Sequence, residues 1–453
     1  MNLACIILAA GKGTRMKSEK AKVLHEICFK PLLHYSVKLA TDLKSKKVIA
    51  VVGHQEATVR DKFGDSDVIF STQEQQLGTG HAVQCAIDKL DDEADILIVN
   101  GDSPLFRHET ISEFYKEYKA ADASVAILTA NAPDPTNYGR VVKDGAGNFL
   151  RIVEEKDADK ETKKISEVSS GTYLVKKNFL IDALKNISNS NAQNEYYLTD
   201  ILSIAVNEGR AVVAHVMKDF DEGMGVNSRL DQANAERVMR CRINEKYMLD
   251  GVTMLNPEST YIEDGVEISN DVTIHPGVTI RGKSVINEGA TIHNGVIISD
   301  SEIGVGSVVL PYSVIEKSQI EDKVSVGPFA RLRPGAVIKS GAKIGNFVEV
   351  KNSTIGEGSK AGHLTYLGDA TIGADVNIGA GTITCNYDGS QKFKTIIEDC
   401  SFIGSNSSLV APVTIKEGAL VGAGAVITKD VPAGTIAVER SSQRHYKRDK
   451  EGN

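Results

Sequence analysis

The chain has 453 residues, of which 41% are hydrophobic and 25% are charged, and its formal net charge is −8. This length allows two or three domains at ~150 residues each, and the acidic balance argues against a nucleic-acid or anionic-membrane partner. No apolar run approaches the ~20 residues that span a bilayer. The six cysteines are scattered without a C-x-x-C pair, which indicates free thiols, a reducing compartment and no zinc site. These features predict a cytoplasmic protein.

Up to about residue 228, short β-branched runs alternate with longer amphipathic stretches, which predicts βαβ units in a mostly parallel sheet. The apolar opening, residues 1–10, is interpreted as the first strand and not as a signal peptide, because no basic segment precedes it. Ligands of such sheets bind at the carboxyl ends of the strands, so the site is expected there. The expected strands are 6–9, 48–52, 96–99 and 123–128, and the expected helices are 32–43, 80–90 and 110–118.

A charged stretch from Ser228 to Gly251 predicts a connecting helix. Ser228 is suited to cap its start and Gly251 to end it. The expected organisation is therefore an N-terminal domain over residues 1–227, a helix over 228–251 and a C-terminal domain over 252–453. Four residues spaced at i, i+4 give the helix one apolar stripe: Ala235, Met239, Ile243 and Tyr247.

From residue 262 onward, aliphatic residues recur every six positions, which is the hexapeptide signature of a parallel β-helix. Three hexads complete a coil, so residues 262–434 predict roughly ten coils. Residues 385–395 break the repeat with a polar turn and are expected to protrude as a loop. The expected inward positions begin with Ile262, Ile268, Ile274, Ile280, Ile286 and Ile292 and resume, after a slip of one residue, with Ile297, Ile303, Val309 and Ile315.

The segment from Leu8 to Met16 comes at the end of the first predicted strand, and its small residues let backbone N–H groups approach a phosphate or a base. A glycine-rich turn alone is as often structural as functional, but Arg15 and Lys22 add two cations suited to a triphosphate. Asp102 follows another apolar strand and is interpreted either as a Mg²⁺ ligand or as a turn-forming residue.

Longer motifs carry a family resemblance: L-A-A-G-K-G-T-R-M at residues 8–16, Q-L-G-T-G-H-A at 76–82, G-D at 101–102, Y-G-R at 138–140, V-E-E-K-D at 153–157, N-E-Y-Y-L-T-D at 194–200 and G-V-N at 225–227. With the hexapeptide half, the chain closely resembles the bacterial bifunctional N-acetylglucosamine-1-phosphate uridylyltransferase / glucosamine-1-phosphate N-acetyltransferase family. The resemblance implies an α/β Rossmann-like nucleotidyltransferase domain, a left-handed parallel β-helix acetyltransferase domain, a homotrimer, and a role in making UDP-N-acetylglucosamine for peptidoglycan and lipopolysaccharide.

In the first half, the resemblance implies that N-acetylglucosamine 1-phosphate attacks the α-phosphorus of UTP and pyrophosphate leaves, a reaction that depends on positioning and charge neutralisation. Two positions depart from the family. Asn100 stands where Tyr is usual, and Ser169 stands where Asn is usual; the serine side chain still donates and accepts hydrogen bonds but reaches less far than that of asparagine. The resemblance implies Gly139 and Glu154 for the N-acetylglucosamine part, with a further sugar contact at Ser169, and places Asn100 and Gly101 in the shared nucleotide and sugar site. The other implied roles are Leu8, Ala9, Ala10, Gly11, Gln73, Gly78 and Thr79 for the nucleotide, Arg15 and Lys22 for the phosphates, and Asp102 and Asn227 for Mg²⁺.

In the second half, residues 362–369 interrupt the repeat and contain His363. Acetyl transfer from a thioester to an amine needs a base, and histidine is poised for this near neutral pH, although a lone histidine is more often structural. The resemblance implies His363 as general base oriented by Glu349. It further implies Arg333, Lys351, Tyr366, Asn377, Asn386 and Tyr387 for glucosamine 1-phosphate, and Ala380, Ser405, Ala423 and Arg440 for acetyl-CoA.

The resulting hypothesis is a bifunctional enzyme that acetylates glucosamine 1-phosphate and then joins the product to UTP. One alternative is a pyrophosphorylase whose solenoid serves only oligomerisation or regulation, against which the cluster around His363 argues. A second is a non-enzymatic scaffold that binds UTP and Mg²⁺ without releasing pyrophosphate. The basic C-terminal tail, residues 440–450, is either solvated or anion-binding.

Overall fold

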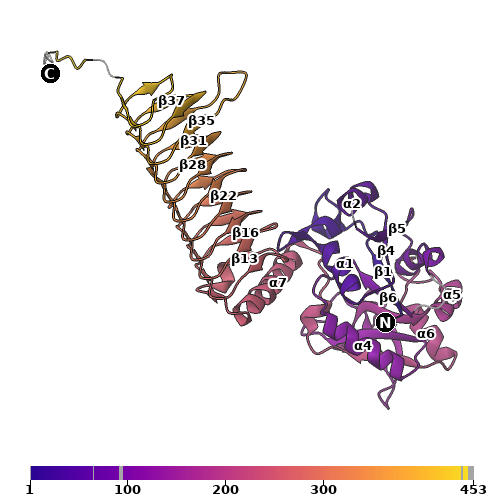
Figure 1. Ribbon diagram of the computed structural model, residues 1–453. Coiled ribbons are helices and arrows are strands. Elements are labelled where there is room, and N and C mark those ends of the chain that lie inside the picture. Colours follow the sequence, from indigo (N-terminus) through magenta and orange to yellow (C-terminus); the bar gives the residue numbers. More distant parts are fainter. Residues whose placement is uncertain (1, 65, 91–94, 440–441, 447–453) are drawn as a thin grey trace, which may run out of the picture. The chain divides into compact units, whose positions relative to one another are not determined.

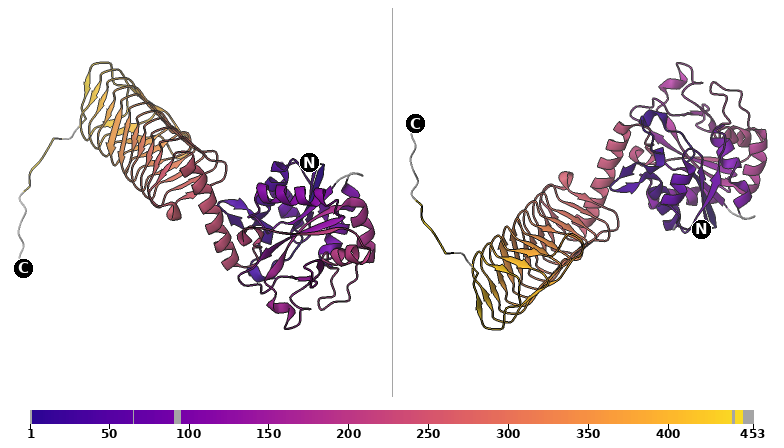
Figure 2. Two further views of the ribbon diagram at one scale, coloured as in Figure 1. Left: turned by 90° about the horizontal axis from the view of Figure 1, so that it is seen from below. Right: turned by 90° about the horizontal axis from the view of Figure 1, so that it is seen from above.

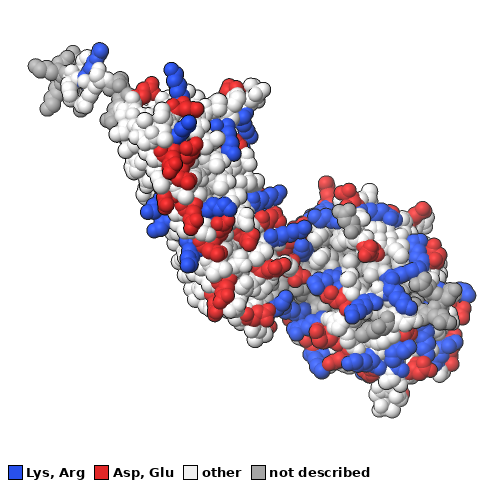
Figure 3. All heavy atoms as spheres, viewed as in Figure 1, with Lys and Arg blue, Asp and Glu red and all other residues white. Residues whose placement is uncertain are grey.

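The computed structural model describes residues 2–64, 66–90, 95–439 and 442–446. The chain forms two compact units, Met1–Met239 and Arg240–Asn453, whose boundary falls inside the predicted connecting helix, α7 (Arg229–Leu249) (Figure 1, Figure 2). Within the described ranges, no helix has the length and apolar character needed to cross a bilayer. On the visible face of the first unit, Lys and Arg side chains are interspersed with Asp and Glu (Figure 3).

The first unit is built on a twisted sheet with strand order β11-β7-β10-β6-β1-β4-β5, extended by the hairpin β8–β9. The strands are β1 (Leu3–Leu8), β4 (Lys47–Val52), β5 (Val68–Thr72), β6 (Asp95–Asn100), β7 (Val125–Asn131), β8 (Arg140–Lys143), β9 (Phe149–Val153), β10 (Glu167–Lys176) and β11 (Val212–Val216). The helices before α7 are α1 (Leu32–Asp42), α2 (Glu56–Lys62), α3 (Thr79–Gln84), α4 (His108–Ala120), α5 (Lys177–Asn186) and α6 (Asp200–Asn207).

The four predicted strands and three predicted helices are present, although the expected helix over 80–90 is divided into α3 and a 3₁₀ turn at Ile87–Lys89. The largest departure from a parallel sheet is β10, which runs antiparallel between β6 and β7. Because β10 runs in the opposite direction, its first residues lie beside the carboxyl end of β6. Ser169 is thereby placed at the edge of the sheet where ligands are expected.

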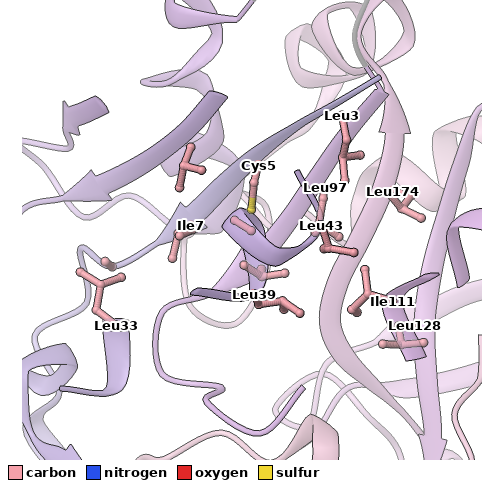
Figure 4. Packing of buried hydrophobic residues seen from close by; sticks show 14 of the residues in the cluster. Leu3, Cys5, Ile7, Leu33, Leu39, Leu43, Leu97, Ile111, Leu128 and Leu174 are labelled. Atoms are coloured by element: carbon pink, nitrogen blue, oxygen red, sulfur yellow. The ribbon is translucent and has the colours of Figure 1, made fainter. Parts of the chain in front are cut away.

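Helices cover both faces of this sheet, because alternate residues of its buried strands point to opposite sides. Leu3, Cys5 and Ile7 of β1 pack on one face with residues of α1 and α4 (Figure 4). Ala4 and Ile6 pack on the other face with α3, α5 and α6. Burial in this core raises the pKa of Cys5 to about 12, so this thiol is a packing residue and not a nucleophile.

The second unit is a parallel β-helix made of three sheets with 11, 10 and 9 strands, from β12 (Thr253–Met254) to β41 (Ile436–Ala437). Figure 1 shows these short strands stacked coil upon coil. Each strand pairs in parallel with the strand one coil later; Ile280 of β16 (Thr279–Arg281), for example, lies opposite Ile298 of β19 (Ile297–Ser299). The predicted coil number of roughly ten is confirmed.

The expected hexad register is wrong at one position. Ile297 is 40% exposed, whereas Ile298 is fully buried and continues the six-residue spacing from Ile292. The spacing of inward residues falls from six to five one hexad later than expected, between Ile298 and Ile303, where the chain passes from β19 to β20 (Glu302–Ile303). Two adjacent isoleucines fit either register in the sequence, so only the packing decides which one points inward.

This correction predicts a difference in stability between two neighbouring substitutions. We expect Ile298→Ala to lower the free energy of unfolding of the solenoid by about 2–5 kcal/mol, because it opens a cavity in a close-packed interior. Ile297→Ala is the matched control and should cost much less, since that side chain is already partly in water. Urea unfolding followed by circular dichroism measures both, and equal losses would contradict the register.

Candidate active sites

A cavity of about 830 Å³ lies at the carboxyl edge of the sheet in the first unit, within the size range of small-molecule sites. Gly101 is not part of its lining; its N–H ties β6 to β1 by donating to the Leu8 carbonyl at 2.9 Å. The cavity brings together the other predicted residues of this half: Leu8, Ala9, Ala10, Gly11, Arg15, Lys22, Gln73, Gly78, Thr79, Asn100, Asp102, Gly139, Glu154, Ser169 and Asn227.

The loop after β1 delivers two cations to this cavity. Gly13 has a φ of 61°, and a Cβ there would lie 2.7 Å from the Cβ of Lys22, so glycine is needed for the loop to pack against Lys22. The Lys22 ammonium forms an ion pair with the Asp102 carboxylate and donates to Oδ1 of Asn227 at 2.7 Å. The Arg15 guanidinium donates to the same Asn227 oxygen at 2.8 Å.

The first residues of α7 hold Asn227 in place. Ser228 Oγ accepts from the Asp231 N–H at 3.2 Å, and the Asp231 carboxylate accepts from the N–H groups of Ser228 at 2.8 Å and Asn227 at 3.0 Å. This reciprocal arrangement is a capping box, and it confirms Ser228 as the helix cap. Asp231 also lines the cavity and was missed in the sequence, although the S-x-x-D spacing was a usable signal.

Asp102 and Asn227 offer a site for a divalent cation. Both present oxygen atoms to the same ammonium, that of Lys22, so the two ligands converge where a cation is accommodated. Mg²⁺ prefers oxygen ligands and commonly takes one or two from the protein and the rest from phosphates and water. Among the described residues no cluster of three or more His, Cys, Asp or Glu could hold a metal. The pair therefore fits Mg²⁺ that is completed by a nucleotide.

A turn before α3 forms another wall of the cavity. Gln73 is buried, and its amide N–H donates to the Gly78 carbonyl at 3.0 Å. Gly78 has a φ of 112°, and a Cβ there would lie 2.6 Å from the Tyr196 carbonyl oxygen, so glycine is required at this close approach. The Thr79 hydroxyl accepts from the Leu198 N–H at 3.0 Å, which joins this turn to residues 194–200.

The far end of the cavity holds the residues predicted for the sugar. The Ser169 hydroxyl accepts from the Gly171 N–H at 3.1 Å, and a Cβ at Gly171 would lie 2.6 Å from the Asn100 amide nitrogen. The two positions that depart from the family thus lie around one glycine. Burial raises the pKa of Glu154, to which the Thr199 hydroxyl donates at 3.3 Å. Thr199 was missed as a cavity residue, although its motif had been recognised.

The neighbouring carboxyls Glu154 and Glu155 should respond to pH with opposite signs. Burial raises the pKa of Glu154, so its ionised form destabilises the fold at neutral pH, and this penalty fades as pH falls through the raised pKa. A hydrogen bond from Arg140 lowers the pKa of Glu155, so its contribution is favourable at neutral pH and is lost as pH falls. At pH 7.5 we expect Glu154→Gln to melt above the parent and Glu155→Gln below it.

Melting curves between pH 3.5 and 8 measure both effects. The difference between each variant and the parent should shrink toward the acid end, where the carboxyls are protonated in the folded and unfolded chains alike. Two differences of the same sign at pH 7.5 would contradict this assignment of burial at Glu154 and pairing at Glu155.

In the second unit, most of the predicted acetyl-CoA residues align in one column. The strand pairings β30–β33, β33–β36 and β36–β39 carry the register from His363 to Ala380, then to Ser405 and then to Ala423 on successive coils. All three side chains in this column after His363 are small; Ser405 and Ala423 are exposed and Ala380 is half-buried. Arg440 lies outside the described residues.

A cationic face lies on the sheet that follows this edge. Glu349 and Tyr366 face each other on β28 (Glu349–Lys351) and β31 (Tyr366–Gly368), and Arg333 donates to Glu349 at 2.8 Å. A hydrogen bond and charge repulsion from Lys392 lower the pKa of Lys351, so Lys392 adds a third cation that was not predicted. Arg333, Lys351 and Lys392 together make a site suited to a phosphate.

The loop predicted for residues 385–395 is present as residues 386–394, between β34 (Ile383–Cys385) and β35 (Thr395–Ile397), and it borders this face. Asn386 hydrogen-bonds through its amide to the Asp369 carboxylate, and Tyr387 is 60% exposed, with its hydroxyl donating to the Gly389 carbonyl at 2.5 Å. Asn377, on β33 (Asn377–Ile378), belongs to a different sheet and pairs with Lys360.

The expected partner of His363 is different in the structure. Glu349 was predicted to orient the imidazole, but it pairs with Arg333, on another sheet. Nδ1 of His363 instead lies 2.6 Å from Oδ1 of Asn346. Sequence spacing did not reveal this because Asn346 becomes the neighbour of His363 only through the register of two successive coils.

Comparison with known proteins identifies the family of each half of the chain. Residues 4–237 match the nucleotidyl transferase family, and residues 394–429 match the bacterial transferase hexapeptide family, in its six-repeat form. These matches define the class: a nucleotidyltransferase joined to a hexapeptide-repeat transferase. The chain is 48% identical over 444 residues to a protein named Bifunctional protein GlmU from Geotalea uraniireducens, covering 98% of this chain and 97% of that one.

Two further relatives with the same name are similar over nearly the whole chain. The protein of Caldanaerobacter subterraneus is 48% identical over 441 residues, covering 97% of this chain and 96% of the relative. That of Clostridioides difficile is 44% identical over 443 residues, covering 98% and 96%. The chain belongs to the GlmU family of bifunctional enzymes.

The membership confirms the predicted family, the fold class and the enzyme class. The chain is a bifunctional enzyme of UDP-N-acetylglucosamine synthesis, with a Rossmann-like uridylyltransferase unit and a left-handed β-helix acetyltransferase unit. Neither alternative, a solenoid with only a structural role or a non-enzymatic scaffold, agrees with this membership.

Proposed function

We propose that the cavity of the first unit carries out uridylyl transfer with Asp102 and Asn227 as the protein ligands of Mg²⁺. The observation that supports this proposal is the convergence of their side-chain oxygens on the Lys22 ammonium inside the cavity. Bound there, Mg²⁺ neutralises phosphate charge and orients the oxygens of UTP. Arg15 and Lys22 bind the same phosphates and stabilise the charge that develops on pyrophosphate as it leaves.

The remaining cavity residues position the two substrates. The backbone of Leu8 to Gly11 and the turn with Gln73, Gly78 and Thr79 hold the nucleotide. The opposite end, with Gly139, Glu154, Ser169 and Asn100, holds the N-acetylglucosamine part. The sugar phosphate is already anionic and attacks the α-phosphorus directly, so no protein base is needed.

In the second unit, His363 accepts the proton that the amine of glucosamine 1-phosphate loses when it attacks the thioester carbonyl of acetyl-CoA. Arg333 and Lys351, with Lys392, bind the phosphate, and Tyr366, Asn377, Asn386 and Tyr387 bind the sugar. The column Ala380, Ser405 and Ala423 holds acetyl-CoA because small side chains leave room along the edge, and Arg440 contributes a cation for its phosphates.

The enzyme works as a cytoplasmic homotrimer without a nucleic-acid or membrane partner. A ladder of exposed aromatic rings supports an assembly of copies: Tyr312 stacks on Phe329 at 5.5 Å between ring centroids, and Phe329 on Phe347 at 5.3 Å. These rings are 48–55% exposed along the edge that leads to His363. Exposed apolar rows of this kind are typical of interaction surfaces.

Substrate pairing tests the proposal. Pyrophosphate release with UTP should require N-acetylglucosamine 1-phosphate and Mg²⁺, and thiol release from acetyl-CoA should require glucosamine 1-phosphate. Pyrophosphate release that is equally fast with the unacetylated sugar would contradict the assigned order of the two reactions, and an absence of thiol release would contradict the acetyltransferase site.

A further inference from the structure

Asn346 and His363 face each other at an unusual place in the solenoid. They end β27 (Lys343–Asn346) and β30 (Lys360–His363), whose four residues make them the longest strands of the described solenoid. The pairing of these strands sets Asn346 directly opposite His363. A Cβ at Gly345 would lie 1.8 Å from the Gly362 carbonyl oxygen, so only glycine permits this close approach.

The contact between the two side chains fixes where the imidazole carries its hydrogen. Oδ1 of Asn346 lies 2.6 Å from Nδ1 of His363. A carbonyl oxygen can only accept, so Nδ1 must donate, and in the neutral ring the lone pair is then on Nε2. The backbone of the same segment is also held, because Leu364 N–H donates to the Asn346 carbonyl at 3.0 Å and the Thr365 hydroxyl donates to the His363 carbonyl at 2.7 Å.

The charged and titratable groups on these two strands and on the neighbouring β28 and β31 are Lys343, Lys360, Glu349, Lys351 and Tyr366, and Glu349 is engaged by Arg333. The polar partner of the ring is therefore neutral. An uncharged acceptor selects the tautomer without adding a negative charge that would favour the protonated, inactive ring.

We infer that Asn346 is the positioning residue of the acetyltransferase site: it holds His363 as the Nδ1–H tautomer, with Nε2 directed to the substrate amine. This inference rests on the proposed role of His363 as base. In the reaction, the amine nitrogen bonds to the acetyl carbon, the carbon–sulfur bond breaks, and the proton passes from nitrogen to Nε2 while the CoA thiolate leaves and later recovers a proton.

Two variants test the inference through the pH profile of acetyl transfer. Asn346→Ala should lower kcat/KM at neutral pH by roughly 10- to 100-fold, the loss seen when the orienting partner of a metal-ligating histidine is removed. Asn346→Asp keeps a hydrogen-bond acceptor and adds a charge, so it should retain more activity than Asn346→Ala at high pH. Because a carboxylate favours the protonated imidazole, the acid limb of its profile should move to higher pH by roughly one unit.

The matched control is Asn294→Asp. Asn294 lies in the same column of the solenoid three coils before Asn346, by the pairings β18–β21, β21–β24 and β24–β27, and the substitution adds the same charge away from His363. It should leave the profile unchanged. Thermal unfolding and pyrophosphate release establish that each variant is folded.

The outcomes separate this inference from the proposed function. If His363→Ala loses acetyl transfer but both Asn346 variants keep the parent's rate and pH profile, the positioning role of Asn346 is wrong, whereas the role of His363 as general base still holds. If His363→Ala stays active, the proposed function itself is wrong. If Asn294→Asp shifts the pH profile as much as Asn346→Asp does, the shift comes from the added charge alone and not from the contact with His363. That result would overturn the inference.

Discussion

Asp102→Ala should strongly reduce uridylyl transfer and leave acetyl transfer near normal. The substitution removes one of the two oxygen ligands proposed for Mg²⁺ and the carboxylate that pairs with Lys22. A bound metal contributes several kcal/mol of transition-state stabilisation, and each 1.36 kcal/mol is tenfold in rate, so we expect a loss of roughly 10²–10⁴-fold. Pyrophosphate release measured across a series of Mg²⁺ concentrations gives the effect.

Asp88→Ala is the matched control for this experiment. Asp88 is also an aspartate of the first unit, but its side chain is 73% exposed and pairs with its neighbour Lys89. It should keep the parent's rate and Mg²⁺ dependence. Asp102→Ala with near-normal pyrophosphate release would show that the cation lies elsewhere, and loss of both activities in a folded protein would contradict the division of labour between the units.

His363→Ala should have the reverse effect, lowering acetyl transfer by roughly 10²–10⁴-fold, the usual contribution of a positioned general base. The imidazole is exposed on the edge of the solenoid and packs no core, so stability should change little. Thiol release from acetyl-CoA with glucosamine 1-phosphate measures the loss. Pyrophosphate release with N-acetylglucosamine 1-phosphate should stay at the parent's rate.

His293→Ala controls for the loss of a solenoid histidine. His293 stacks on His275 with ring centroids 4.4 Å apart, on coils well before His363. It should leave acetyl transfer unchanged while His363→Ala loses it. A substantial residual rate in His363→Ala would mean that another group removes the amine proton.

The hexapeptide solenoid could be predicted almost completely, because every coil places aliphatic residues inward, mostly at a six-residue spacing. Each coil packs on the next coil at a nearly fixed distance along the sequence, so this spacing alone locates the strands. The six-residue spacing did not decide between Ile297 and the adjacent Ile298. It also left out Thr384, which points inward just before the loop at residues 386–394 although it is not aliphatic. The loops around Gly11 and Asp102 were also recognisable, since each follows a buried strand whose carboxyl end faces the ligand edge. Gln73 was assigned only through the family resemblance, because the strand before it is mostly not buried.

The antiparallel course of β10 was not predictable from its composition, because an apolar strand has the same residues in either direction. That direction decides that Ser169 lies beside Asn100. The partner of His363 was equally hidden: Glu349 is three residues closer to His363 in sequence than Asn346 is, yet the coil register places it on another sheet.

The amino-acid sequence by itself determined the two-part architecture, the family and the chemical character of both sites, because these depend on periodic spacing and on motifs that are local in the chain. Only the tertiary structure decided which side chains are in contact: Lys22 with both Asp102 and Asn227, and Asn346 with His363. The physical reason is that contacts between distant segments depend on strand direction and on register to within one residue, and a shift of one residue turns a side chain to the opposite face.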